Sequence, residues 1–437
     1  MREQATKLGL ATLLLGLGML HCGPLPPPGT GGSAGVGGSA GQGGSSGAGA
    51  QPNTLPGFTN LAPPMGAALP TTGTPLSPPP PAGWTWYQID GAICRDGSPT
   101  GFYVRYNNAS DKLLVYLEGG GACVSPGFCT YNPANVNQVL AGDGQTSVGS
   151  IGGAVAGRQQ PYTTGMFDEN NPANPFRGWN KVYVPYCTGD VHFGSRPNAT
   201  LPGLAAPQQF VGYLNMQKFV ARWVPTFASR VNKVMLTGTS AGSFAAGLNY
   251  SMVQDAFGSV RVDVIMDSGV PFDNEYMPVC MQQKWRANWN MNASLPPDCT
   301  ECRDPAGGNM LRLADFLIRK HPNTKLGLIS AMEDDVMRLF FSISNNNCAG
   351  YETADPVLNF IAGIYPAPTY HAGVQAVRTR YASTGRLSTY YLGGANNIFH
   401  QHLWRPRFYE NAASPTGVSI AQWAGNFQNG QMSQVGP

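Results

Sequence analysis

The chain has 437 residues, of which 12% are charged, and its formal net charge at pH 7 is only +3. This balance excludes the strongly basic surface that nucleic-acid binding or attraction to an anionic membrane would require. The length allows one large domain or two of average size.

The N-terminus has the pattern of an export signal. Arg2 and Lys7 precede the apolar stretch 8–20, which is too short to span a bilayer comfortably and suits the apolar region of a secretory signal peptide. Cys22 follows, where a lipoprotein signal places its acylated cysteine, although the residue before it is larger than that pattern expects. We therefore expect residues 1–21 to be a lipoprotein-type signal and Cys22 to carry a lipid. The protein would then be exported, either anchored at the cell envelope or secreted.

A long segment of small residues follows the signal. Residues 31–50 are nearly all Gly, Ser and Ala, and such a segment cannot bury enough surface to offset the entropy lost on ordering it. The proline run 78–81 stiffens its end. We expect residues 22–83 to be an unfolded tether and residues 84–437 to form one globular domain with long insertions.

The chain contains nine cysteines. Setting Cys22 aside leaves an even number, which in an exported chain favours disulfides over metal ligands or redox thiols. Cys123 and Cys129 flank a short loop that a disulfide could close. Cys299 and Cys302 form a CxxC pair, for which a structural bridge is expected outside the cell. The sequence leaves the other pairings open.

Short apolar runs recur along the domain, and stretches of helical period lie between some of them. The strand-like runs are 112–117, 181–186, 233–237, 262–266, 325–329 and 388–392, and the helical stretches are 208–228 and 311–319. Continuous apolar runs of this length suit parallel strands covered on both faces. The alternation predicts a doubly wound, mostly parallel α/β sheet of the α/β-hydrolase type, with helices on both faces and reactive groups beyond the carboxyl ends of the strands.

The segment Gly238-Thr239-Ser240-Ala241-Gly242 follows the third strand-like run and precedes a helical one. The pattern G-x-S-x-G is typical of a nucleophile elbow, because a serine on a sharp strand-to-helix turn needs very small neighbours. The N–H of Ala241 would then point to the place where an oxyanion forms. The alternative is a tight Gly/Ser-rich turn without chemistry.

Three glycines, 119–121, follow the first strand-like run. They allow backbone N–H groups to converge on one point, as an oxyanion hole requires. An irregular loop that needs positive φ is the alternative. A phosphate loop is disfavoured, because neither the Lys-Ser/Thr pair nor a dinucleotide-binding spacing follows.

Candidate acids and bases stand after the later strands. Asp334 follows the fifth strand-like run, and Asp267 ends the fourth as a competing acid. His400 and His402 lie in the loop after the sixth. The order serine, acid, histidine is the one expected of an α/β-hydrolase, although an acidic cluster that caps the next helix is an alternative for the 333–335 region. No spacing typical of metal ligands is present.

Several of these segments together resemble the pectin acetylesterase and Notum-like carboxylesterase family. The similar segments are 117–123 (LEGGGAC), 186–190 (YCTGD), 238–245 (GTSAGSFA) and 267–269 (DSG), and the resemblance extends over most of residues 84–409. It implies Ser240 as nucleophile, Asp334 as orienting acid, and an oxyanion hole from the N–H groups of Gly120, Gly121 and Ala241. The run from His402 to Trp404 resembles the ending of bacterial relatives, so His402 is preferred to His400 as the base.

The resemblance implies a secreted serine carboxylesterase that hydrolyses short acyl esters, such as acetyl groups on a polysaccharide. Gly121 stands where the Notum branch has an aromatic residue lining its lipid pocket, which implies a short acyl group. We expect no metal or organic cofactor and no nucleic-acid partner. We expect a monomer that contacts a membrane only through the lipid. The alternatives are a lipase or polyester depolymerase with the same triad, and a carbohydrate-binding surface protein that has lost turnover.

Overall fold

The computed structural model describes residues 73–77, 83–141, 152–303, 310–411 and 416–437. The expected signal peptide, Cys22 and most of the expected tether therefore lie outside the described residues. Within the described ranges, none of the helices has both the length and the apolar character needed to cross a membrane.

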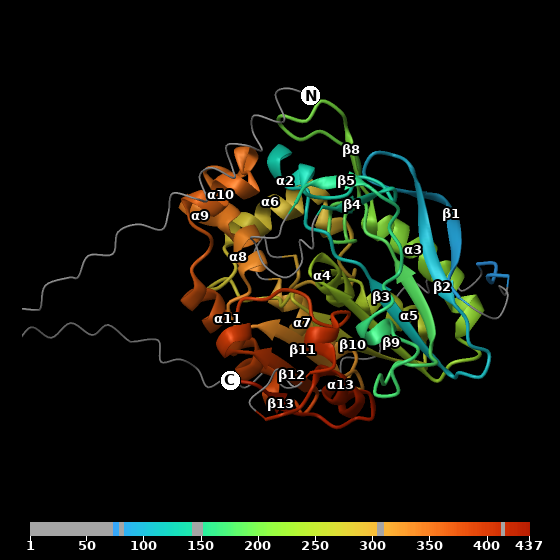
Figure 1. The fold of residues 1–437 in the computed structure, drawn as a ribbon. Coiled ribbons are helices and arrows are strands. Elements are labelled where there is room, and N and C mark those ends of the chain that lie inside the picture. The colour runs from blue at the N-terminus through green and yellow to red at the C-terminus, as the bar shows by residue number, and fades with distance from the viewer. Residues whose placement is uncertain (1–72, 78–82, 142–151, 304–309, 412–415) are drawn as a thin grey trace, which may run out of the picture. The chain divides into compact units, whose positions relative to one another are not determined.

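Nine strands of the described residues form one sheet (Figure 1). In sheet order they are β1 (Thr85–Ile93), β2 (Pro99–Arg105), β6 (Asn180–Val184), β3 (Lys112–Leu117), β9 (Lys233–Thr239), β10 (Arg261–Asp267), β11 (Leu326–Ala331), β12 (Leu387–Leu392) and β13 (Gln434–Val435). The pairs β1–β2 and β2–β6 are antiparallel, and all other pairs are parallel. The expected mostly parallel sheet is confirmed.

Side chains of alternate strand residues enter two separate cores. In β3, Leu113, Val115 and Leu117 belong to one hydrophobic cluster, whereas Leu114 and Tyr116 belong to another on the opposite face. Successive side chains of a strand point to opposite faces, so a strand covered on both sides must be apolar at nearly every position. This is why the strand-like runs in the sequence lack the polar alternation of a half-exposed sheet.

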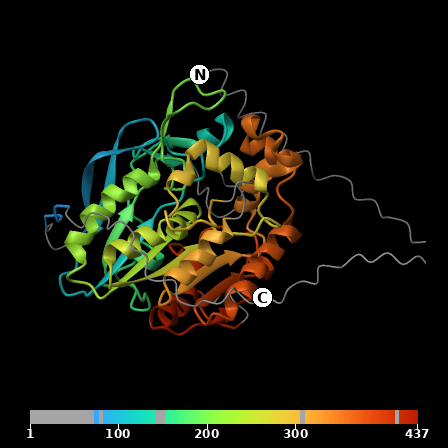
Figure 2. The ribbon, with the colours of Figure 1, turned by 180° about the vertical axis from the view of Figure 1, so that it is seen from behind.

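Helices cover both faces of the sheet. The first cluster includes side chains of α3 (Gly212–Phe227), α4 (Ala241–Leu248), α5 (Tyr250–Phe257), α7 (Leu311–Lys320) and α11 (Ala367–Ala382). The second includes side chains of α12 (Pro406–Tyr409) and α13 (Ile420–Gln428). In the view from behind, the green helix α3 crosses in front of the strands (Figure 2). The expected two-sided covering of the sheet is confirmed.

Shorter elements connect these layers. The helices α2 (Pro126–Thr130), α6 (Val279–Trp289), α8 (Asp335–Phe341), α9 (Asn345–Cys348) and α10 (Pro356–Ala362) lie together at the upper left of Figure 1. Two antiparallel ribbons pair β4 (Gln138–Leu140) with β5 (Ala154–Ala156) and β7 (Arg196–Ala199) with β8 (Gln208–Phe210). Single 3₁₀ turns are η2 (Gly165–Phe167), η3 (Met291–Ala293), η4 (Ser342–Ser344), η5 (Tyr351–Thr353) and η6 (Gly394–Asn396).

The expected helix over 208–228 begins later than its apolar spacing indicates. Residues 208–210 form β8 instead, and α3 starts at Gly212. The carboxylate of Asp190 accepts the N–H of Gly212 at 2.7 Å, so a residue distant in sequence satisfies a donor at the start of the helix. Local periodicity could not reveal this boundary.

The folded domain also begins earlier than residue 84. Within the expected tether, Leu76 is buried in the first hydrophobic cluster, and its N–H donates to Thr226 Oγ1 in α3 at 2.8 Å. The hydroxyl of Tyr87 donates to the carbonyl of Ser77 at 2.7 Å. Residues 73–77 therefore pack against the domain through one buried leucine and hydrogen bonds to α3 and β1.

All eight cysteines of the described residues are paired in disulfides. The expected bridges Cys123–Cys129 and Cys299–Cys302 are present. Two further bridges, Cys94–Cys187 and Cys280–Cys348, join segments far apart in the chain. The prediction of structural disulfides is confirmed.

We predict that these bridges stabilise the domain according to the loops they close. Cys94 and Cys187 are 93 residues apart, whereas Cys299 and Cys302 are 3 apart. Loop-closure entropy then gives about 4–5 kcal/mol for the long loop and about 2 kcal/mol or less for the short one. In urea unfolding, the Cys94→Ala/Cys187→Ala double variant should lose at least twice as much stability as Cys299→Ala/Cys302→Ala. Equal losses would contradict this account.

Candidate active site

Ser240 lies on a sharp turn between β9 and α4. Its backbone has φ 57° and ψ −122°, a combination that a non-glycine residue adopts only when its surroundings impose it. A Cβ at Gly238 would lie 2.2 Å from the carbonyl oxygen of Gly242, and one at Gly242 would lie 1.9 Å from that of Leu117. Both flanking positions therefore require glycine, and the segment has the geometry of a nucleophile elbow.

The glycine loop 119–121 lies directly against this elbow. A Cβ at Gly119 would be 2.8 Å from Cβ of Ser240 and 2.3 Å from the carbonyl oxygen of Thr239. Ala241 is the first residue of α4, so its N–H has no partner within the helix. The structure thus brings together the two segments from which the sequence predicts an oxyanion hole.

Two side chains donate hydrogen bonds to backbone carbonyl groups, one just before the glycine loop and one within it. The imidazole of His192 donates from Nε2 to the carbonyl of Glu118 at 2.9 Å. Burial lowers the pKa of His192 to about 4, so the ring is neutral at physiological pH. The amide of Asn132 donates to the carbonyl of Gly120 at 2.9 Å. These bonds fix the orientation of the peptide groups in the loop.

The support of Asn132 extends to a buried arginine. Nε of Arg95 donates to Oδ1 of Asn132 at 3.2 Å, and Nη2 donates to the carbonyl of Asn132 at 2.8 Å. Burial lowers the pKa of Arg95 to about 10, which still leaves the guanidinium charged at neutral pH. Arg95 therefore binds both the side-chain oxygen and the backbone carbonyl of Asn132.

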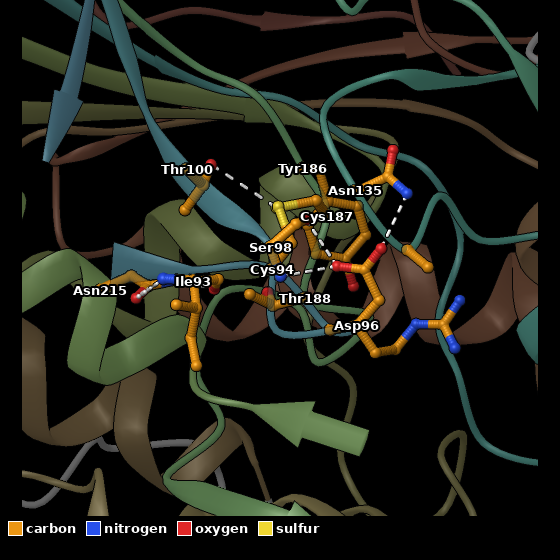
Figure 3. Close-up of a disulfide and its surroundings, with 12 residues drawn as sticks. Ile93, Cys94, Asp96, Ser98, Thr100, Asn135, Tyr186, Cys187, Thr188 and Asn215 are labelled. Atoms are coloured by element: carbon orange, nitrogen blue, oxygen red, sulfur yellow. Dashed lines mark hydrogen bonds between the residues drawn. A yellow bond between two sulfur atoms is a disulfide. The ribbon is translucent and has the colours of Figure 1, made fainter. Parts of the chain in front are cut away.

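The Cys94–Cys187 disulfide, drawn in Figure 3, joins the segments that contain Arg95 and Tyr186. Cys94 precedes Arg95 in the chain, and Cys187 follows Tyr186, whose ring is 3.1 Å from the position of a Cβ at Gly120. The side chain of Asp96 accepts hydrogen bonds from Ser98 and Asn135 in the same region (Figure 3). The bridge thus joins the two segments that surround the glycine loop.

Asp334 and His400 form one buried pair. Oδ2 of Asp334 accepts the Nδ1–H of His400 at 2.7 Å, and Oδ1 accepts the N–H of Met337 at 2.9 Å as the N-cap of α8. The exposed fractions of these two residues are 0% and 1%. Asp334, rather than Asp335, is therefore the residue that caps this helix.

Asp267 and His402 form a second buried pair. Oδ1 of Asp267 accepts the Nδ1–H of His402 at 2.7 Å, and Oδ2 accepts the N–H groups of His402 and Leu403 at 2.6 and 2.8 Å. Burial by itself would raise the pKa of Asp267. The charge of His402 and these hydrogen bonds outweigh that effect and hold the pKa below its ordinary value.

The expected pairing of Asp334 with His402 is therefore wrong: Asp334 faces His400, and Asp267 faces His402. The reason lies in Gln401, whose φ of 59° turns the chain between the two histidines. The turn directs one imidazole to Asp267 at the end of β10 and the other to Asp334, the N-cap of α8. Among the described residues, Nε2 of neither ring has a hydrogen-bond partner, so both rings keep a free nitrogen.

A hollow of about 270 Å³ opens beside the glycine loop. Its lining combines the backbone of Gly119 and Gly120 with apolar and polar side chains, including Glu118, Pro133, Leu140, Arg158, Gln160 and Tyr162. The guanidinium of Arg158 lies over the ring of Trp86 at 4.4 Å and donates to Asn137. Within the described residues, no carboxylate forms an ion pair with Arg158.

An elbow serine, a glycine loop against it and histidine–aspartate pairs from later strands of a parallel sheet define the α/β-hydrolase class of fold. The chain belongs to the pectinacetylesterase family, whose profile matches residues 86–312, more than half of the chain. The matched range includes Ser240 and Asp267 and ends before Asp334 and the 400–402 loop.

Curated relatives are similar over part of their length. The Drosophila melanogaster palmitoleoyl-protein carboxylesterase NOTUM is 28% identical over 219 residues, which are 48% of this chain and 31% of that protein. The inactive palmitoleoyl-protein carboxylesterase notum1b of Danio rerio is 31% identical over 114 residues, 25% of this chain and 71% of that protein. The chain therefore spans about a third of the length of the Drosophila relative.

A solved structure confirms the fold. The Wnt deacylase Notum from Drosophila aligns with a TM-score of 0.55 and 18% identity, covering 80% of this chain and 95% of that chain. At this identity the likeness concerns the arrangement of the backbone.

Sequence reasoning missed the residues that support the site. Arg95, Asn132 and His192 act on the glycine loop from segments without a recognisable motif. No local signal marked them, because Arg95 and Asn132 stand beside turn-forming residues rather than within an apolar run. The sequence predicts Asp267 only as a competing acid. Its pairing with His402 depends on hydrogen bonds to backbone N–H groups that converge only in the folded loop.

We predict that Glu118 makes stability depend on pH. Burial raises its pKa to about 7 from the ordinary 4.5, and the polar groups of Tyr183, Tyr186 and Tyr162 offset only part of this. Because the folded state holds this proton more tightly than the unfolded state, the group lowers stability as pH rises from about 4.5 to about 7. The thermal midpoint of Glu118→Gln should therefore rise relative to that of the wild type between pH 5 and pH 8.

The exposed Glu410→Gln substitution is the matched control, because it removes one negative charge from the surface. A difference between Glu118→Gln and wild type that is the same at every pH would show that Glu118 titrates alike in both states.

Proposed function

We propose that this protein is an exported serine carboxylesterase that removes short acyl groups, such as acetyl, from a polysaccharide. The observation that carries the proposal is the strained Ser240 in contact with the glycine loop, at the sheet edge where the buried Asp334–His400 pair also lies. Membership of the pectinacetylesterase family supports the same chemistry.

Each group has a defined role in the proposed reaction. The hydroxyl of Ser240 attacks the ester carbonyl while Nε2 of His400 accepts its proton. Asp334 accepts the Nδ1–H, which leaves Nε2 unprotonated in the neutral ring and stabilises the imidazolium that forms. The N–H groups of Gly120, Gly121 and Ala241 stabilise the oxyanion. His400 then protonates the leaving alcohol, and water hydrolyses the acyl-enzyme with the same base.

Two observations support His400 rather than His402 as the base. A Cβ at Gly121 would be 3.1 Å from the ring of Phe340 in α8, so the glycine loop meets the helix that Asp334 caps. The ring of His402 instead packs edge-on against Phe408, with centroids 5.0 Å apart, and Phe408 belongs to the cluster on the other face of the sheet. The Asp334–His400 pair is thus associated with the side of the elbow that holds the glycine loop.

The surroundings of the glycine loop support a small acyl group and a polar alcohol. The ring of Phe340 restricts the space at Gly121, whereas the hollow beside Gly119 and Gly120 offers the guanidinium of Arg158 and the amide of Gln160. Sugar hydroxyl and carboxylate groups are suitable partners for these side chains. The Drosophila relative is named for a palmitoleoyl ester, so a long acyl chain is the alternative that the substrate test must separate.

Export is consistent with the disulfides, which persist in oxidising compartments. A lipid on Cys22 belongs to this proposal and rests on the N-terminal sequence pattern alone. Mass analysis of the N-terminus of the protein isolated from its native envelope would test it.

We predict that the proposed base can be identified by comparing two variants. With a chromogenic acetate ester, Ser240→Ala and His400→Ala should each lower kcat by about 10³-fold or more, because members of one triad act as a unit. His371→Ala is the matched control, since this imidazole is 41% exposed. It should keep wild-type activity.

Wild-type activity in Ser240→Ala would end the proposal. A wild-type protein that binds acetylated glycan but neither turns it over nor reacts with a fluorophosphonate probe would indicate the non-catalytic alternative, for which the inactive zebrafish relative is a precedent. Preference for long-chain esters or insoluble polyester would indicate a lipase or depolymerase.

We predict that Arg158 binds an anionic part of the substrate. Arg158→Gln should raise KM for an acetylated acidic polysaccharide by about tenfold, the effect of about 1.4 kcal/mol, because the charge-assisted bond is lost. KM for a small neutral acetate ester should change less than about twofold. Arg312→Gln, which removes an exposed arginine of α7, is the control. Equal changes with both substrates would contradict a role in charge recognition.

A further inference from the structure

The second histidine–aspartate pair has no role in the proposed reaction, although it is completely buried. Asp267 accepts four hydrogen bonds: from Nδ1 of His402, from the hydroxyl of Ser268 and from the N–H groups of His402 and Leu403. Burying a charge costs free energy unless it is paired and fully hydrogen-bonded, and here both conditions are met. So many bonds on one carboxylate indicate a structural demand at this position.

The next residue, Ser268, also binds the loop that contains the two histidines. Oγ of Ser268 accepts the N–H of Gln401 at 2.8 Å. Three consecutive N–H groups, those of residues 401, 402 and 403, therefore end on the side chains of two consecutive residues at the end of β10. These N–H groups immediately follow His400, so they fix the direction in which the chain leaves that residue.

The segment that precedes His400 is hydrogen-bonded to the residues on either side of Asp334. The N–H of Asp335 donates to the carbonyl of Ile398 at 3.1 Å, and that of Glu333 donates to the carbonyl of Asn397 at 2.7 Å. His400 thus lies between a segment bonded to the Asp334 region and a segment bonded to Asp267 and Ser268. A shift of either segment would move the imidazole away from Asp334.

Asp267 also contacts the backbone of the nucleophile. Its carbonyl accepts the N–H of Ser240 at 2.9 Å, at the end of the parallel pairing between β9 and β10. Oε1 of Gln401 accepts the hydroxyl of Thr239 at 3.1 Å, which gives a second link between the histidine loop and the elbow. One residue therefore bonds both the segment that carries the nucleophile and the segment that carries the base.

We infer that Asp267 is a positioning residue that sets the His400 loop relative to Ser240, and that His402 serves as its hydrogen-bond donor rather than as a base. The inference rests on the proposed function, because it assigns the proton transfer to His400. Its consequence is that His402 acts through its Nδ1–H donor and takes no part in the proton transfer.

The test uses the full chain, a chromogenic acetate ester and the variants His402→Asn, His402→Ala, Asp267→Asn and Ser268→Gly. Asparagine can place an N–H donor near the position of Nδ1 but has no titratable ring. His402→Asn should therefore keep kcat within about tenfold of wild type and keep the acid limb of the pH profile of kcat/KM. His402→Ala and Asp267→Asn should lower kcat by about 10- to 100-fold with KM changed less than about twofold.

Ser268→Gly provides a second variant, which keeps both Asp267 and His402 and removes only the hydroxyl that donates to Asp267 and accepts the N–H of Gln401. Ser268 has φ 59°, which glycine adopts without strain, so a loss of activity there reports the missing Oγ. We expect kcat to fall by about three- to tenfold. Thermal midpoints are measured for every variant, and rates are compared at a temperature where all are folded.

Three results would overturn the inference. His402→Asn as inactive as Ser240→Ala would make His402 the base. Wild-type kcat in Asp267→Asn and His402→Ala, while Ser240→Ala and His400→Ala are inactive, would remove the positioning role and leave the proposed function intact. Losses of activity that only parallel the decrease in thermal midpoint, or that appear in KM rather than kcat, would show that the Asp267–His402 pair stabilises the fold without positioning His400. Full activity in Ser240→Ala would overturn both proposals together.

Discussion

The contact between the elbow and the end of β3 is the constraint on which the site depends. Gly242 is so close to the carbonyl of Leu117 that no side chain fits between them. This approach brings the start of α4 against the loop that follows β3, and thus the N–H of Ala241 against Gly119 to Gly121. Parallel pairing of β3 with β9 and of β9 with β10 then determines which strand ends surround the serine.

Much of this arrangement follows from local sequence. Strands covered on both faces must be apolar at successive positions, so β3, β9 and β12 could be recognised as continuous runs. The elbow could be recognised because its geometry excludes every residue but glycine at two positions. The paired segments β1, β2 and β8 carried no such signal, since they lie in antiparallel pairs whose partners are needed to explain their conformation.

The partner of each histidine could not be read from the sequence. The left-handed conformation of Gln401 separates His400 from His402, and glutamine has no special preference for it. That conformation is held by hydrogen bonds that Gln401 accepts from Thr239 and Trp404 and by one that its N–H donates to Ser268. The choice between two neighbouring imidazoles was therefore made by tertiary contacts.

The Cys94–Cys187 bridge makes the surroundings of the glycine loop depend on the redox conditions around the protein. The bridge lies between Arg95, which holds Asn132, and Tyr186, whose ring faces Gly120. In a reducing cytoplasm this covalent link would be open, and the glycine loop would lack one of its supports. Oxidation of Cys94 and Cys187 in an oxidising compartment would then complete the covalent support of the glycine loop.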